Sequence, residues 1–289
     1  MELTRTAHDL RAATDAWRAA GGRVGLVPTM GALHAGHVSL IERARATTDR
    51  VVVSIFVNPR QFGRTEDFDR YPRDETADLA ICERVGADAV WAPAVDEVYP
   101  PGADLPIPEP GPVGAVFEGA ARPGHFEGVL TVVHRLLDVT GPCDAFFGEK
   151  DAQQLFLVRR MVASSPTLAG SVVVGCPTVR EADGLAMSSR NAYLGPAERA
   201  QAGCLFLALT EAAARARAGE RDPAVLVAVM AREIGATSLA RLDYAAVVDD
   251  RTFMPPAVIE APARAIVAAR FPGARLIDTL RLPIDEVPT

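Results

Sequence analysis

The amino-acid sequence predicts an α/β fold, with a parallel sheet in its N-terminal part followed by a smaller α+β domain. Short apolar runs rich in β-branched residues alternate with segments of helical periodicity up to about residue 178. This alternation is typical of parallel strands joined by right-handed helical crossovers. The chain has 289 residues, of which 49% are hydrophobic and 23% charged, enough for two ordinary domains with sizeable cores.

The N-terminal elements follow from these apolar runs. Strands that are buried on both faces of a parallel sheet have continuous apolar sequences rather than alternating ones. The helical segments between them carry apolar side chains along one face. The predicted strands are 24–27, 51–57, 87–91, 144–147 and 171–176, and the predicted helices lie near 37–48, 74–85, 126–140 and 151–163.

The C-terminal part has a different order of elements. Residues 93–112 are rich in proline, glycine and acidic residues, and we expect an excursion from the sheet there. Beyond about residue 180, helices are predicted at 196–218 and 222–234, followed by strands at 242–248, 265–270 and 275–282. We therefore expect one domain over 1–178 and a smaller one over 179–289.

Composition and charge exclude several classes of function. The formal net charge is −7, and the arginines are scattered among acidic residues, so we expect no nucleic-acid partner. The four cysteines are widely spaced among apolar neighbours, which favours buried free thiols over a metal site or disulfides. No signal peptide and no apolar run long enough to cross a bilayer are found. We expect a soluble cytoplasmic protein with no membrane partner.

The most informative segment carries two histidines around a glycine, in the sequence Pro-Thr-Met-Gly-Ala-Leu-His-Ala-Gly-His at 28–37. It follows a predicted strand and leads into a predicted helix, which places His37 near the helix start. Unpaired N–H groups and the helix dipole favour an anion such as phosphate there. His34 and His37 can add hydrogen bonds to phosphate oxygens. Metal binding by the pair is the alternative, but no adjacent carboxylate or His-Glu-x-x-His pattern completes a site.

Two further segments carry charged or polar groups at predicted strand ends or loops. Lys150 and Gln154 lie where the predicted strand 144–147 enters a helix, and Lys150 can neutralise a triphosphate; Asp151 is also suited to capping that helix. Arg190, in the segment 183–191 with its glycine and serines, can bind phosphate through its guanidinium fork. An ordinary exposed turn is the alternative for 183–191.

Two more turns are polar. The segment 58–62 follows the strand 51–57, so its side chains lie at the carboxyl edge of the sheet, while the polar ends of the turn 122–126 face either ligand or solvent. No Gly-x4-Gly-Lys-Ser/Thr loop or Gly-x-Ser-x-Gly elbow is present.

Taken in order, these segments resemble the pantothenate synthetases, or pantoate–β-alanine ligases, along nearly the whole chain. The His-x-Gly-His element alone marks a wider superfamily of nucleotidyl-transferring folds, whereas the combination is specific to this family. The matching motifs are Pro-Thr-Met-Gly-x-Leu-His-x-Gly-His at 28–37, Ser-Ile-Phe-Val-Asn-Pro at 54–59 with Gln61-Phe62, Tyr-Pro-Arg at 71–73, Glu-Gly-Ala-x-Arg-Pro-Gly-His-Phe at 118–126, Phe-Gly-Glu-Lys-Asp-x-Gln-Gln at 147–154, and Asp-Gly-Leu-Ala-Met-Ser-Ser-Arg-Asn at 183–191.

The resemblance implies a Rossmann-like N-terminal nucleotide-binding domain, a smaller C-terminal lid and a ligase that forms a C–N bond in two steps. The carboxylate of pantoate attacks the α-phosphate of ATP, giving pantoyl adenylate and pyrophosphate. β-Alanine then attacks the adenylate to give pantothenate and AMP. A mixed anhydride supplies the leaving group that a free carboxylate lacks, and catalysis is mostly positioning and charge stabilisation.

The resemblance also implies roles for individual residues. His37 is the expected proton donor, and His34 contacts the phosphates with it. Lys150 and Arg190 neutralise the triphosphate, and these four are the expected catalytic residues. The backbone around Gly148 and Val179 holds the adenosine, while Ser188, Ser189 and Met187 close over the phosphates. The implied ATP-binding residues are Met30, Gly31, Ala32, Leu33, His34, Ala35, Gly36, His37, Gly148, Glu149, Lys150, Asp151, Val179, Met187, Ser188, Ser189 and Arg190.

For the other ligands, the resemblance implies that Gln61 and Gln154 bind pantoate and that Gln61 is shared with β-alanine. Mg²⁺ is expected on the ATP phosphates, with Asp78 as a candidate to approach it, although Ala77 stands where a second acid would strengthen that assignment. The expected form is a homodimer. Two other functions stay open at this stage: an adenylyltransferase that releases a stable adenylated product, and a non-catalytic nucleotide-binding protein.

Overall fold

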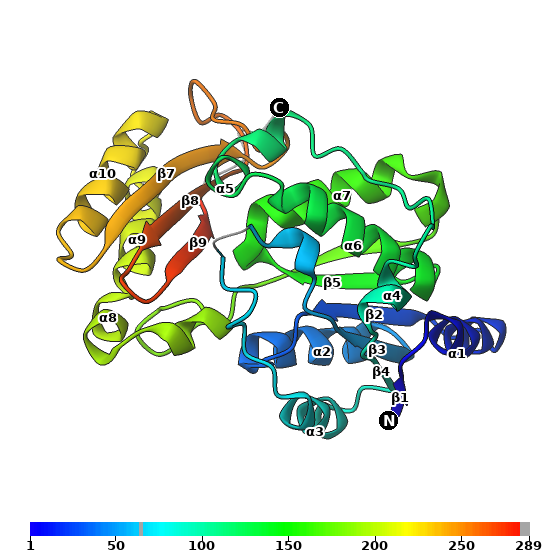
Figure 1. The fold of residues 1–289 in the computed structure, drawn as a ribbon. Helices are drawn as coiled ribbons and strands as arrows, with labels where there is room; N and C mark the ends of the chain where they lie inside the picture. Colours follow the sequence, from blue (N-terminus) through cyan, green and yellow to red (C-terminus); the bar gives the residue numbers. More distant parts are fainter. Residues whose placement is uncertain (64–65, 284–289) are drawn as a thin grey trace. The chain divides into compact units, whose positions relative to one another are not determined.

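The computed structural model of the chain describes residues 1–63 and 66–283 (Figure 1). The chain forms two compact units, of which the first comprises Met1–Glu149 and Gln153–Pro177. The second comprises Lys150–Ala152 and the residues from Thr178 onward. The domain boundary that we expected between 178 and 179 stays a prediction; the second unit resumes at Thr178. The short segment Lys150–Ala152, expected in the first domain, groups with the second unit.

The first unit is built on a six-stranded sheet with the order β1-β4-β3-β2-β5-β6, in which every pair of neighbouring strands is parallel (Figure 1). This confirms the predicted α/β class. The strands are β1 (Glu2–Thr4), β2 (Val24–Thr29), β3 (Arg50–Ile55), β4 (Ala89–Trp91), β5 (Asp144–Gly148) and β6 (Val172–Cys176). The α-helices are α1 (Ala7–Ala19), α2 (Ala35–Thr47), α3 (Glu75–Val85), α4 (Val95–Val98), α5 (Glu118–Ala121), α6 (His125–Thr140) and α7 (Ala152–Ser164).

Helices cover both faces of this sheet, which explains the unbroken apolar runs of its central strands. On one face, Leu40, Ile41 and Ala44 of α2 pack in one buried cluster with Val27 of β2 and Val53 of β3. On the other face lie α6 and α7 (Figure 1), and α6 is buried along most of its length. Burial of these side chains on both faces is the main stabilising contribution to the unit.

The strand order reverses between β2 and β5, and ligands of open α/β sheets bind at such switch points, beyond the carboxyl ends of the strands. The two strands pair only through Gly25 with Asp144 and Leu26 with Ala145. The cause is visible in β2. The carbonyl of Thr29 accepts a hydrogen bond from Phe56, so Thr29 faces β3 and the preceding residue, Pro28, faces β5. Proline has no N–H to continue the ladder, and the strands separate toward their carboxyl ends.

The second unit has an antiparallel three-stranded sheet of order β7-β8-β9, as the predicted α+β composition required. Helices α9 and α10 pack against one another and against this sheet. Their buried side chains, among them Leu209 and Met230, join Val247 and Val267 of the strands in one apolar core. The elements are α8 (Pro196–Gln201), α9 (Cys204–Arg217), α10 (Pro223–Gly235), β7 (Arg241–Asp249), β8 (Ala263–Arg270) and β9 (Arg275–Arg281).

Several boundaries differ from the prediction. The single helix expected over 196–218 is two helices, α8 and α9, because a turn at Ala202–Gly203 interrupts the helix. The predicted strand 51–57 begins one residue earlier, at Arg50, and ends at Ile55, three residues before the polar turn at 58–62. Strand β1 and helix α1 were missed, and the excursion at 93–112 contains the short helix α4. In the part of the chain that the structure describes, no helix has both the length and the apolar character needed to span a bilayer.

Candidate active site

The turn after β2 is fixed by a buried carboxylate from another element. Asp78 on α3 accepts hydrogen bonds from the backbone N–H groups of Ala32 (2.9 Å) and Leu33 (2.7 Å). Gly31 has φ +77°, and a Cβ there would lie 2.8 Å from the Asp78 carboxylate, so glycine is required. Burial raises the pKa of Asp78, opposed by these two backbone hydrogen bonds. Asp78 was expected near Mg²⁺; its observed partners give it a role in the turn, and its approach to a metal stays a prediction.

The two histidines cap helix α2 with one nitrogen each. His34 is the N-cap residue, and its Nδ1 accepts from the Gly36 N–H at 3.1 Å. The Nδ1 of His37 accepts in return from the His34 N–H at 3.3 Å, and the ring centroids are 4.1 Å apart. A nitrogen that accepts from a backbone N–H carries no proton, so each neutral ring is protonated at Nε2. The helix cap thus selects the tautomer in which both imidazoles offer an Nε2–H.

Gln61 lies at the end of a 3₁₀ turn, Pro59–Gln61, directly after β3. Its orientation follows from that of Asn58, which is buried with all its hydrogen-bonding positions used. Asn58 Oδ1 accepts from the Arg60 N–H (3.1 Å), and its Nδ2 donates to the Gly128 carbonyl (3.1 Å), so neither end of this amide can be exchanged. Asn58 Nδ2 also donates to Gln61 Oε1 at 3.1 Å.

Because Gln61 Oε1 is engaged in this way, its Nε2 must be the group on the other side, where it contacts the sulfur of Met30 at 2.9 Å. Gln61 therefore presents a hydrogen-bond donor beside the β2 turn. A donor there suits a ligand with acceptor oxygens, such as a carboxylate or a hydroxyl. The structure brings together Met30 and Gln61, both predicted from the sequence.

Tyr99 completes this network from the segment after α4. Its hydroxyl donates to Asn58 Oδ1 at 2.7 Å. Burial raises the pKa of Tyr99 to about 12, so the hydroxyl stays protonated and remains a donor. The Arg60 guanidinium lies over the Tyr99 ring at 4.0 Å. Sequence reasoning missed Tyr99, because it lies in the proline-rich excursion and no local signal links it to Asn58.

Gln154 is partly buried in the first turn of α7, next to a glutamine that the sequence analysis did not single out. Gln153 accepts from the Glu118 N–H at 3.1 Å and donates to the carbonyls of Val113 (2.7 Å) and Val116 (2.8 Å). These three bonds fix the start of α7 and hence the place from which the Gln154 side chain extends.

Lys150 and the loop 178–190 belong to the second unit and are described with it. Strand β5 ends at Gly148, and a 3₁₀ turn, Glu149–Asp151, leads into α7, as the predicted strand-to-helix transition required. Lys150 is mostly buried, with 18% of its side chain exposed, and its Nζ lies 3.6 Å from Asp151 Oδ1.

The loop containing Val179 and Met187 is a hairpin-like turn closed by a backbone hydrogen bond between those two residues at 3.0 Å. Arg180 anchors it: its guanidinium binds both carboxylate oxygens of the buried Asp278 (2.6 and 2.9 Å) and the Gly184 carbonyl (2.9 Å). Ser188 Oγ accepts from the Arg190 N–H at 3.3 Å and starts the 3₁₀ helix Ser189–Tyr193. Sequence reasoning missed Arg180 and Asp278, which lie 98 positions apart in the chain.

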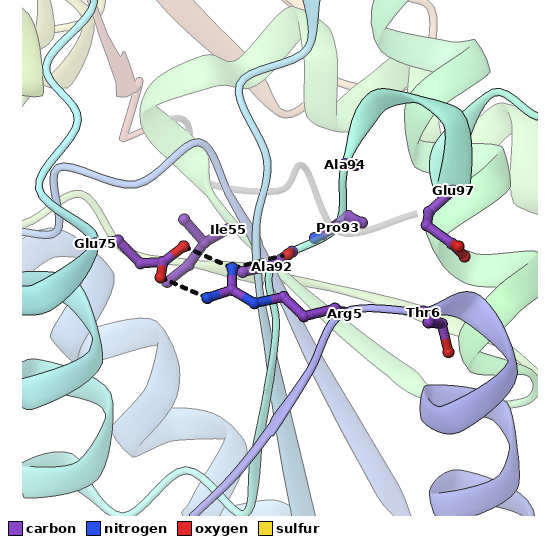
Figure 2. A pocket seen from close by; sticks show the side chains of 8 residues that line it. All are labelled: Arg5, Thr6, Ile55, Glu75, Ala92, Pro93, Ala94 and Glu97. Carbon is purple, nitrogen blue, oxygen red and sulfur yellow. Dashed lines mark hydrogen bonds and ion pairs between the residues drawn. The ribbon is translucent and has the colours of Figure 1, made fainter.

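A cavity of about 440 Å³ lies at another part of the carboxyl edge, near the ends of β3 and β4 (Figure 2). Arg5 and Glu75 both line it and form a two-fold hydrogen-bonded ion pair, with N–O distances of 2.7 and 2.6 Å. Both side chains are about half exposed, so the pair contributes little to stability. None of the site residues predicted from the sequence lines this cavity, and beside the Arg5–Glu75 pair it carries a second carboxylate, that of Glu97, which does not favour an anionic ligand. The switch point is therefore the better candidate site.

The first unit thus defines a class of fold, the open parallel α/β sheets, in which ligands bind beyond a topological switch point and the start of a helix is suited to an anion. The family model of the pantoate-beta-alanine ligases matches residues 2–281. The chain belongs to this family, as its motifs predicted, and it is a ligase of that kind.

Relatives and solved structures agree with this assignment. The chain is 49% identical over 288 residues to a pantothenate synthetase of Rubrobacter xylanophilus, covering 97% of this chain and 98% of the relative. The crystal structure of a pantothenate synthetase from Thermus thermophilus superposes with a TM-score of 0.90 at 47% identity, covering 98% of this chain and 99% of that one. A Francisella tularensis pantoate-beta-alanine ligase, complexed with beta-gamma ATP and beta-alanine, gives a TM-score of 0.79 at 31% identity, with 97% of each chain covered.

Proposed function

We propose that this chain condenses pantoate with β-alanine at the expense of ATP, through a pantoyl adenylate, and releases AMP and pyrophosphate. The observation that supports this most is the pair of histidines that cap the start of α2. Their Nδ1 atoms accept hydrogen bonds from backbone N–H groups. Two Nε2–H donors at a helix N-terminus are suited to phosphate oxygens on which negative charge develops.

In the first step, a carboxylate oxygen of pantoate forms a bond to the α-phosphorus of ATP, and the bond to the bridging oxygen of pyrophosphate breaks. His34 and His37 donate their Nε2–H groups to phosphate oxygens, and His37 is the donor to the leaving group. Lys150 and Arg190 compensate the charge of the triphosphate. Catalysis here consists of alignment and charge stabilisation rather than covalent participation of the protein.

In the second step, the amine of β-alanine attacks the acyl carbon of the adenylate. A C–N bond forms, the C–O bond to the phosphate breaks, AMP leaves, and the amine loses its proton. The Nε2 of Gln61, turned away from Asn58, holds the oxygens of pantoate and then contacts β-alanine. Gln154 binds pantoate from α7. The backbone near Gly148 and Val179 holds the adenosine, and Met187, Ser188 and Ser189 close over the phosphates.

Mg²⁺ belongs to this proposal as a companion of ATP. Within the described residues, no cluster of three or more His, Cys, Asp or Glu side chains is arranged to hold a metal. Mg²⁺ in phosphoryl-transfer sites is often held by the substrate phosphates with few protein carboxylates. The residues that we propose around the triphosphate, which are histidine, lysine and arginine, fit such an arrangement. When bound, Mg²⁺ neutralises phosphate charge. From the family resemblance we also propose a cytoplasmic location and a homodimer. Sedimentation at micromolar concentration tests the dimer directly.

The central test is a pyrophosphate-release assay with ATP, Mg²⁺ and pantoate, followed by addition of β-alanine. We expect release to require pantoate, and AMP and the amide product to appear only after β-alanine is added. Release that is indifferent to pantoate contradicts the proposal, and a released nucleotide adduct in place of AMP identifies an adenylyltransferase instead.

The role of His37 is tested in the same assay. His37→Asn keeps an acceptor near the Nδ1 position and hence the helix cap, but removes the Nε2–H. We expect adenylate formation to fall about 10²-fold or more, as for other aligned donors. The matched control is His8→Asn, a change at an exposed histidine of α1, which should leave the rate unchanged. A near-normal single-turnover rate for His37→Asn would show that the Nε2–H does no chemistry.

A further inference from the structure

The turn between α5 and α6 carries a conspicuous polar motif, Arg122 to His125, to which the proposed function gives no role. Gly124 adopts φ +82°, and His125 is the first residue of α6. His125 is buried, with 8% of its surface exposed. Its Nδ1 lies 2.9 Å from the backbone carbonyl of Gln61, and its Nε2 lies 2.9 Å from Nη1 of Arg122. The motif therefore faces the turn that carries Gln61.

These two partners settle where the proton of His125 resides. A carbonyl oxygen only accepts, so Nδ1 must carry the proton. A guanidinium only donates, so Nε2 must be the bare acceptor. Burial and the charge of Arg122 lower the pKa of His125 to about 4, outweighing the carbonyl of Gln61 and the carboxylates of Glu118 and Glu66. The ring is neutral at physiological pH, in the tautomer opposite to that of the two histidines on α2.

Arg122 is itself held in place. Its Nε and Nη2 donate to the two carboxylate oxygens of Glu66, at 2.8 and 2.6 Å. Nη2 also lies 3.4 Å from the carbonyl of Gln61. His125 and Arg122 thus direct two donors at the same backbone oxygen, and His125 supplies the shorter bond.

The turn that carries Gln61 needs such anchors. Its own backbone hydrogen bonds, from Gln61 to Asn58 and from Phe62 to Pro59, are both 3.4 Å long, beyond the usual range for strong N–H···O bonds. Helix α6 approaches so closely that a Cβ on Gly128 would lie 2.1 Å from the Arg60 carbonyl. The position of Gln61 therefore depends on contacts with α6 as well as on the bonds that Asn58 makes within the turn.

We propose that His125 is a positioning residue for the acid substrate: its Nδ1–H holds the carbonyl of Gln61, so that the Gln61 side chain presents its Nε2 to pantoate. Asn58 fixes which end of the amide faces the ligand, and His125 fixes where the amide stands. This inference rests on the proposed role of Gln61 in binding pantoate. It predicts that losing the Nδ1–H impairs the use of pantoate and spares the binding of ATP.

Two substitutions test the two ring nitrogens of His125 one at a time. His125→Asn places an amide N–H near the Nδ1 position, whereas His125→Gln places its amide near Nε2 and removes the donor to Gln61. We expect His125→Gln to raise KM for pantoate about tenfold, the effect of one lost buried hydrogen bond, with KM for ATP within about twofold of wild type. His125→Asn should restore pantoate use to near the wild-type value. His8→Gln, at the exposed histidine of α1, is the matched control.

Equal losses for pantoate and ATP in His125→Gln, or identical behaviour of the Gln and Asn variants, would overturn the proposal. A parallel measurement needs no substitution in the site. The chain has five histidines, so ¹⁵N spectra of histidine-labelled wild-type protein can resolve each ring. We expect one ring to be protonated at Nδ1 and not to titrate between pH 6 and 8. If every neutral ring is instead protonated at Nε2, the proposal is wrong. This measurement decides the matter even if a variant fails to fold.

Gln61→Ala distinguishes this inference from the proposed function on which it rests. If Gln61→Ala leaves KM for pantoate unchanged, the role of Gln61 is wrong. If Gln61→Ala raises that KM while His125→Gln does not, Gln61 keeps its role and only the positioning by His125 fails.

Discussion

The turn between β2 and α2 depends on one carboxylate, and replacing it tests how that part of the site is held. Asp78→Asn preserves the shape of the side chain but leaves one acceptor where two backbone N–H groups, of Ala32 and Leu33, need one each. One charge-assisted hydrogen bond is lost, and the new NH₂ group faces a buried N–H. A hydrogen bond to a charged group contributes about 1.5–3 kcal/mol. Relief of the buried charge, whose pKa is raised by burial, offsets part of this loss. We expect a net destabilisation of about 2 kcal/mol.

Both tryptophans of the chain, Trp17 and Trp91, lie in the first unit, so urea unfolding followed by tryptophan fluorescence reports on this unit alone. Asp96→Asn, at an exposed carboxylate of α4, is the matched control and should change stability by no more than about 0.5 kcal/mol. If Asp78→Asn unfolds at the same urea concentration as wild type and retains full activity, the carboxylate does not hold the turn.

The same variant tests the expected approach of Asp78 to Mg²⁺. If the carboxylate acts only through the turn, the rate falls at every Mg²⁺ concentration and the half-saturating concentration of Mg²⁺ stays unchanged. A shift of that concentration to higher values, with the rate restored at saturation, would instead make Asp78 a metal ligand.

Three further predictions concern the charges of the site. Gln61→Glu should raise KM for pantoate by about tenfold or more, because a carboxylate oxygen replaces the donor beside an acidic substrate; steady-state kinetics check this, and an unchanged value would mean that pantoate binds elsewhere. Lys150→Met should slow adenylate formation about 10²-fold or more in single-turnover experiments by removing charge from the triphosphate site, and a normal rate would remove Lys150 from the mechanism. The pKa of His125 is lowered from 6.5 to about 4, so between these pH values the unfolded chain binds a proton that the native ring does not. The free energy of unfolding of the first unit should therefore fall by roughly 3 kcal/mol as the pH is lowered from 6.5 to 4. Urea unfolding across this range measures the loss, and an identical slope in His125→Asn would assign it to other groups.

The elements that the sequence predicted well are those whose signal is local. The central strands are buried by helices on both faces, so each is a continuous apolar run, and β2, β3 and β5 were found within two residues of their bounds. Strand β1 has only three residues, and its Leu3 is 41% exposed, so it gives no such run. Helix α1 was overlooked although Thr6 accepts a hydrogen bond from the Asp9 N–H, a helix-start pattern visible in the sequence.

For the site, the sequence could nominate residue types but not their partners. The spacing of His34 and His37 around a glycine predicted a strand-to-helix turn, which the structure confirms. Spacing could not reveal that each Nδ1 caps the helix, which decides the tautomer. Asp78 was noticed as a carboxylate, yet its bonds to the β2 turn cross 45 or 46 positions of sequence. The link between His125 and Gln61 crosses 64 positions and depends on how closely α6 approaches.

Pro28 acts as a wedge at the centre of the sheet. Because Pro28 has no N–H, one backbone hydrogen bond between β2 and β5 is missing. Its absence costs about 1 kcal/mol of stability. In exchange, the ends of β2 and β5 keep their outer neighbours, β3 and β6, but do not pair with one another where the ligand edge begins. Main-chain groups are common to every amino acid, so point substitution cannot erase them. An inhibitor that bonds to the main-chain groups on the facing sides of β2 and β5 would consequently offer few routes to resistance through side-chain change.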